Sequence, residues 1–212
     1  MTRFFTPLAF LGVIGLSLSG CASMDIAECQ TADWETIGYQ DGAAGRPSED
    51  ISRHRKACAK HGVTPILASY IEGWHDGVER YCVPQNGFNT GSAGHQYAGV
   101  CPADIEEDFL IAYSDGKQLN VLESNVQQIS YRISRDQGRI ERIIKSIKKK
   151  EASLISPEGT AKERVQLLAD LRELSEEKGQ LEQSVLDLEH EHGRAEVELE
   201  HYRADIALQY GL

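Results

Sequence analysis

Three aspartates are the residues of this chain that could do acid–base or metal chemistry as a group. Asp41, Asp76 and Asp115 each come directly before a glycine at the end of a short recurring pattern. Converging carboxylates can bind a cation or exchange protons with a substrate, but the spacing here matches no calcium-binding loop. We therefore expect each aspartate to cap or turn the end of a short helix, and we predict no catalytic residue.

Cys21 is the clearest candidate for covalent modification. It follows a nearly continuous apolar run over residues 4–18 and a few small residues, an arrangement that resembles a bacterial lipobox. The run is shorter than the roughly 20 apolar residues of a membrane-spanning helix but is typical of an export signal. We predict a signal peptide over residues 1–20 and a diacylglyceryl group on Cys21. The alternative is an ordinary signal with a chance cysteine after it.

The residue after Cys21 bears on the destination of the protein. Ala22 stands where an aspartate would favour retention in the inner membrane under enteric-type sorting rules. We therefore expect a lipid anchor in the outer membrane, with residues 21–28 as a tether and the rest of the chain facing the periplasm.

The remaining cysteines are even in number, which favours disulfides in an oxidising compartment. We predict two bridges, in any of three pairings, among Cys29, Cys58, Cys82 and Cys101. Zinc is the alternative, because Cys58 and His61 have ligand-like spacing and His54 and His75 lie nearby. No second pair completes such a site, so we predict no metal and no cofactor.

A pattern that recurs three times indicates how the elements of the first region pack. Each copy contains small residues four positions apart, with an aromatic residue after the first of them. Positions i and i+4 share one face of a helix, so each copy offers a smooth stripe for close helix approach. The stripes are Gly38/Gly42, Gly73/Gly77 and Ala112/Gly116.

Residues 82–101 are rich in glycine but fit no phosphate-binding loop, since no strand precedes them and the spacing is wrong. We expect an ordered glycine-rich loop that Cys82 and Cys101 tie at its ends.

A series of short motifs follows in order over about residues 29–119. The motifs are Asp33-Trp34, Gly38-Tyr39, Asp41-Gly42, Gly45-Arg46-Pro47, His54, Cys58, Gly62-Val63, Pro65, Tyr70, Gly73, Tyr81-Cys82, Pro84, Asn86-Gly87-Phe88, Gly91, Gly94, Tyr97 and Val100-Cys101-Pro102. Together they resemble the bacterial lipoprotein family called domain of unknown function 2799, which implies an uncharacterised envelope domain without established site residues.

Residues 119–212 follow a different pattern, in which apolar residues recur in alternating steps of three and four. This periodicity is typical of a coiled coil. A turn over residues 156–160 divides it, and Thr160 with Glu163 matches a capping box that begins a second helix. The net charge is +6 over residues 131–150 and −8 over residues 158–205, which favours antiparallel pairing.

The fold class that follows is mainly α, with a small disulfide-stapled head that contains the glycine-rich loop and a long antiparallel coiled-coil hairpin. We place the head at residues 29–118 and the hairpin at residues 119–212. Five apolar residues lie off the hairpin seam and would face a partner or a second copy. They are Ile144, Ile155, Val165, Leu168 and Val197.

The charge balance and the absence of a reactive motif reduce the number of function classes that we expect for this protein. Thirty-three acidic against 22 basic residues argue against nucleic-acid binding. We expect an outer-membrane lipoprotein that is structural, or that binds an envelope protein or itself through the hairpin, and not an enzyme. The alternative is a small-ligand, peptidoglycan-binding or hydrolytic module that uses the glycine-rich loop with His54, His75 or His95.

Overall fold

The computed structural model describes residues 24–210, and all regular structure in that range is helical. The predicted mainly α fold is confirmed. The elements, in chain order, are α1 (Ile26–Thr31), α2 (Trp34–Ala43), the short 3₁₀ helix η1 (Ser48–Asp50), α3 (Ile51–Ala59), α4 (Leu67–Tyr81), α5 (Pro84–Ser92), α6 (Glu106–Leu154) and α7 (Ala161–Tyr210).

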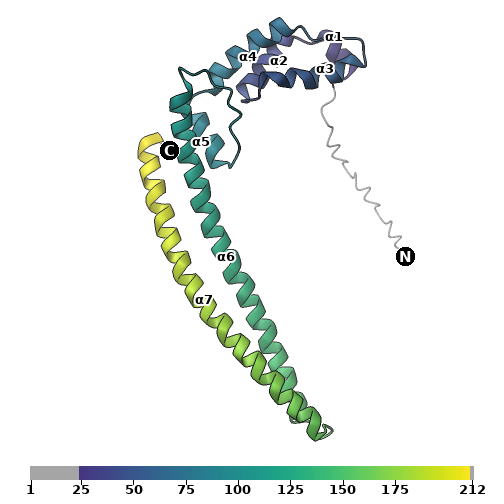
Figure 1. Cartoon of the computed structure of the whole chain (residues 1–212), viewed down its shortest axis with the longest axis vertical. Helices are drawn as coiled ribbons and strands as arrows, with labels where there is room; N and C mark the ends of the chain where they lie inside the picture. The colour runs from purple at the N-terminus through teal and green to yellow at the C-terminus, as the bar shows by residue number, and fades with distance from the viewer. Residues whose placement is uncertain (1–23, 211–212) are drawn as a thin grey trace, which may run out of the picture.

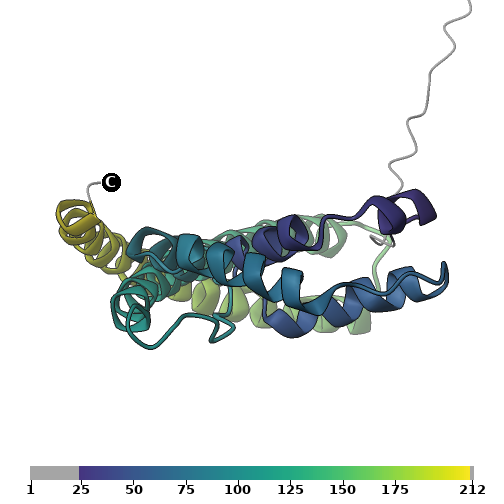
Figure 2. The same cartoon turned by 90° about the horizontal axis from the view of Figure 1, so that it is seen from above.

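Two long helices form an arm, and the short helices gather at one end of it. Figure 1 shows α1 to α4 lying across the end of the α6–α7 hairpin, with α5 beside the first turns of α6. Seen from above, the head lies in front of the arm and covers much of it in projection (Figure 2). α6 begins in the head and continues without interruption through residue 118, so head and arm share one helix.

The first pair of head helices, α2 and α4, packs backbone to backbone through glycines. A β-carbon on Gly38 would collide with the carbonyl oxygen of Tyr70, and one on Gly73 would collide with that of Glu35. Gly42 and Gly77 are equally restricted by the opposite helix. The predicted small-residue stripes therefore face each other, which explains why glycine stands at helical positions despite a cost of about 1 kcal/mol relative to alanine.

The second pair, α5 and α6, repeats this contact. β-Carbons on Gly87 and Gly91 would collide with carbonyl oxygens of α6, and one on Gly116 would collide with the carbonyl oxygen of Phe88. The expectation of a loop over residues 82–101 is therefore wrong for residues 84–92, which form α5. Close packing on α6 outweighs the poor helix propensity of its glycines, asparagines and threonine.

The two pairs are copies of one structural unit. Gly38, Gly42 and Gly45 each recur 49 residues later, while the small residues at 73 and 77 recur 39 residues later, at 112 and 116. The first helix of each pair ends at a glycine of positive φ, Gly45 at 68° and Gly94 at 72°. Each pair also has its own disulfide, which joins the segments that precede its two helices.

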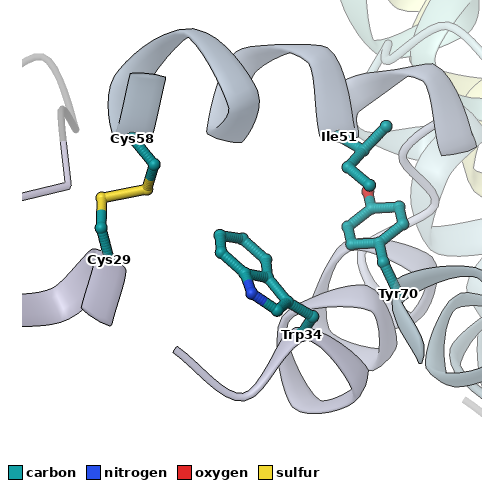
Figure 3. Packing of buried hydrophobic residues seen from close by; sticks show 5 residues of the cluster. All are labelled: Cys29, Trp34, Ile51, Cys58 and Tyr70. Carbon is teal, nitrogen blue, oxygen red and sulfur yellow. A yellow bond between two sulfur atoms is a disulfide. The ribbon is translucent and has the colours of Figure 1, made fainter. Parts of the chain in front are cut away.

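The disulfides are Cys29–Cys58 and Cys82–Cys101, so the prediction of two bridges is confirmed. The first lies at the edge of a buried cluster with Trp34, Ile51 and Tyr70 (Figure 3). Each bridge stabilises the fold by about 2–4 kcal/mol, mainly by restricting the unfolded chain. A domain is usually stable by about 5–15 kcal/mol in total, so this contribution is a large part of the stability of the head.

The arm is the predicted antiparallel hairpin. Ile129 and Ile143 of α6 and Leu188 and Leu199 of α7 are buried between the two helices. The predicted charge pairing is also present, because Arg132, Arg139 and Lys150 of α6 form ion pairs with Glu191, Glu177 and Asp170 of α7.

Two sets of hydrogen bonds stabilise the turn between α6 and α7. The predicted capping box is confirmed, since the Thr160 hydroxyl accepts from the Glu163 amide and Glu163 accepts from the Thr160 amide at 2.8 Å. Arg164 donates back to carbonyl oxygens at the end of α6, those of Leu154 (2.7 Å) and Ser156 (2.8 Å). A cation at the negative end of a helix dipole stabilises that end.

Candidate functional site

The strongest concentration of polar groups in the head surrounds Asp41 of α2. Its side chain is buried, with 3% of the residue exposed. The hydroxyl of Tyr70 on α4 donates to Oδ2 (2.9 Å), and His54 Nε2 on α3 lies 2.8 Å from the same oxygen. Arg46 Nη1 donates to Oδ1 (2.8 Å), and Arg53 Nη2 lies 3.5 Å from it.

These contacts shift the ionisation of both buried groups. Burial alone would raise the pKa of the Asp41 carboxyl, but the donors from His54, Tyr70 and Arg46 outweigh it and hold the pKa below its usual value. Burial, and then the hydrogen bond to Asp41, raise the pKa of the Tyr70 phenol above its usual value. At neutral pH the carboxyl is ionised and the phenol is protonated.

This network can hold helices together, and neither Asp41 nor Tyr70 is free within it to act as an acid or base. Both oxygens of Asp41 are occupied by donors from the chain, and Tyr70 is fully buried. The buried Asp41 carboxylate, whose hydrogen bonds are satisfied, links α2, α3 and α4 through polar contacts. The arrangement therefore suits a structural contact between these helices.

The other two aspartates lie apart from Asp41 and from each other. Asp76 is exposed on α4, and Asp115 lies on α6 at the contact with the end of α7. None of the three caps a helix end, so that expectation is wrong. All three aspartates lie inside helices, at the same position of the recurring motif. The contacts of each side chain depend on the elements that pack around it.

Asp115 binds the C-terminal end of the arm. Its Oδ2 accepts from the hydroxyl of Tyr210 (2.7 Å), and its carbonyl oxygen accepts from the hydroxyl of Tyr202 (2.9 Å). Burial, followed by the hydrogen bond to Asp115, raises the pKa of the Tyr210 phenol. Ile206 packs against Phe88 and Ala112 in the same place, so the last turns of α7 close over the second pair.

The histidines of the alternative hypothesis are not brought into one site. His54 belongs to the Asp41 network, His75 packs its ring against Trp74, and His95 accepts a hydrogen bond from Tyr113 through its carbonyl oxygen. Among residues 24–210 no group of three or more His, Cys, Asp or Glu side chains could hold a metal ion. The glycine-rich segment serves helix packing through α5.

Cys21, with the predicted signal peptide, lies outside the described residues. Within the described range, none of the helices has a stretch long and apolar enough to span a membrane.

The arm presents the exposed apolar side chains that the sequence places off the seam. Ile155, Val165, Leu168 and Val197 are exposed, while Ile144 is half-buried. Leu186 and Leu208 of α7, which are absent from the predicted set, are exposed as well. The sequence could have predicted their exposure, because both are apolar and neither falls on the predicted seam of the hairpin.

Comparison with known proteins gives one match, which lies in the head. Residues 33–118 match the model of the family described as Protein of unknown function (DUF2799), which confirms the resemblance over the head. The matched segment ends inside α6, so the family covers both helix pairs and leaves the arm outside. No curated protein and no solved structure matches the chain.

Proposed function

We propose that this protein is a lipid-anchored protein of the bacterial outer membrane, with a structural head and an arm that binds another protein in the periplasm. The lipobox-like sequence at Cys21 and the two disulfides support the location, because stable disulfides need an oxidising compartment. The head supports a structural role, since its most buried carboxylate is fully occupied by contacts within the chain.

The observation that carries the binding role is the exposed apolar surface of the arm. A 50-residue helix is about 75 Å long, and α7 exposes large apolar side chains along much of that length. Exposed apolar rows of this kind usually mark an interaction surface.

Photo-crosslinking in cells tests the binding role. A photoreactive amino acid at Val197 of the arm should give a discrete crosslinked product in the full chain. The same residue at Ile66, which is equally exposed on the head, is the matched control and should give none. Crosslinks from Ile66 alone, or from neither position, would reject the arm as the binding element.

The anchor is tested separately. The substitution Cys21→Ser should block lipidation and processing and remove the protein from the outer-membrane fraction, because the lipid is the proposed attachment to that membrane. Unchanged processing and partition would reject the lipoprotein assignment.

A further inference from the structure

α7 carries a second row of residues on the face away from α6. The row advances in steps of three or four from Val165 to Leu208, so its members share one side of the helix. We call it the outer row. Between residues 186 and 208 it contains no Asp, Glu, Lys or Arg, and its members there are Leu186, His190, Gly193, Val197, His201, Ala204 and Leu208.

The outer row is open to solvent along its length. Leu186, Val197 and Leu208 are 52%, 65% and 89% exposed, and Val165 and Leu168 continue the row toward the turn with 68% and 55%. Forty-three residues of helix separate Val165 from Leu208, which corresponds to about 65 Å. The buried side of α7 faces α6 through a different set, which includes Val185, Leu188, Ala195, Leu199 and Ile206.

Glycines in the outer row provide an independent observation. Helical glycines in the head each meet the backbone of a neighbouring helix, as Gly38, Gly73 and Gly116 do. A β-carbon added to Gly179 or Gly193 of the outer row would meet nothing within 4 Å, so no contact among the described residues requires glycine there. Glycine at these two positions would let another helix approach the backbone of α7 closely, as the helical glycines of the head do in their own pairs.

The charges beside the outer row define what can approach. Between residues 186 and 208 the positions outside the row carry seven acidic side chains and two basic ones. A second copy of α7 would bring acidic flanks against acidic flanks, and an anionic membrane surface would be repelled in the same way. The second copy's α6 is basic over residues 131–150, but Tyr131 is the one large apolar side chain exposed in that described stretch, so it offers no apolar row to pair with the outer row.

The contact between α6 and α7 shows which chemistry this helix accepts. On the seam side, basic side chains at Arg132, Arg139 and Lys150 pair with acidic residues of α7 around an apolar centre. A helix that complements the outer row needs the same features: an apolar seam, with lysine or arginine on its flanks.

We propose that the outer row binds an amphipathic helix of another protein whose apolar seam is flanked by lysine and arginine, which would lie beside α7 as the third helix of a bundle. This inference rests on the proposed function and names the chemistry of the partner.

A designed peptide tests the inference with the full chain. The probe is a fluorescein-labelled 28-residue helical peptide with leucine at the a and d positions of its heptads and lysine at e and g. A sister peptide carries glutamate at e and g. We expect the lysine peptide to raise the fluorescence anisotropy on binding, and the glutamate peptide to bind at least about tenfold more weakly.

Apolar variants separate docking in the row from attraction by charge alone. The triple variant Leu186→Ser, Val197→Ser, Leu208→Ser should weaken binding of the lysine peptide by about tenfold or more. The matched control replaces Val121, Tyr131 and Ile155, which are exposed outside the row, with serine and should change binding less than about twofold. Circular dichroism spectra should show unchanged helix content in both variants, because every replaced side chain is exposed.

Three outcomes would overturn the inference: no binding of the lysine peptide, equal binding of the glutamate peptide, or unchanged binding by the triple variant. A fourth is a dimer in sedimentation that the triple variant abolishes, which would make a second copy the occupant. None of these four outcomes determines the result of the crosslinking test of the proposed function, because that test detects binding by the arm whatever the chemistry of the partner.

Discussion

Asp41 shows how one buried side chain can connect three helices of the head. The substitution Asp41→Asn keeps the size of the side chain but removes the charge that His54, Tyr70 and Arg46 surround. We expect it to lower the free energy of unfolding by about 2–4 kcal/mol. Asp76→Asn, at the exposed position of the next motif copy, is the control and should change it by less than about 0.5 kcal/mol. Urea unfolding measures both.

The same carboxyl makes the stability of the head depend on pH. Its pKa is lower in the folded chain than in the unfolded chain, where the ordinary value is about 3.9. The stabilisation is therefore present above that value and is lost as the pH falls through the lower folded pKa. Urea unfolding between pH 5 and pH 2 should show this acid loss in the wild type. A loss of equal size in Asp41→Asn would assign it to other groups.

At the scale of elements, the glycines of the head and of the arm should respond to alanine with opposite signs. Gly73→Ala would push α4 away from the Glu35 carbonyl oxygen and should cost about 3 kcal/mol or more. Gly179→Ala meets nothing within 4 Å and should stabilise the chain by up to about 1 kcal/mol through helix propensity. Thermal unfolding followed by circular dichroism gives both signs, and a stabilising Gly73→Ala would contradict the packing described here.

Local sequence patterns predicted those elements whose signals agree with their surroundings. The coiled-coil periodicity, the Thr160 capping box and the small-residue stripes of α2, α4 and α6 are all in the structure. α5 was missed because its composition favours a loop and only contact with α6 makes it a helix. Thr90 also stands where the other copies of the motif have aspartate. For this reason Gly87 and Gly91 were not predicted to form a fourth stripe of small residues.

At the scale of the whole molecule, the head and the arm are one packed body and not a domain with an appended spacer. Ile206, Tyr202 and Tyr210 of α7 cover Phe88 and Ala112 of the head. Periodicity could not predict this contact, since it indicates that a face is apolar but not which distant segment covers it. Removing the whole arm would therefore uncover part of the head.

Because the end of α7 contacts the head, a substitution there should also reduce the local stability of α5. Ile206→Ala removes a side chain that is 4% exposed and should destabilise the chain by about 2–4 kcal/mol. Because Ile206 packs on Phe88, 118 residues earlier in the sequence, hydrogen exchange should become faster in α5 as well as at the end of α7. Ala207→Gly, one position along the same helix, is a control for the local helix. Faster exchange confined to α7 in Ile206→Ala would mean that the arm ends without stabilising the head.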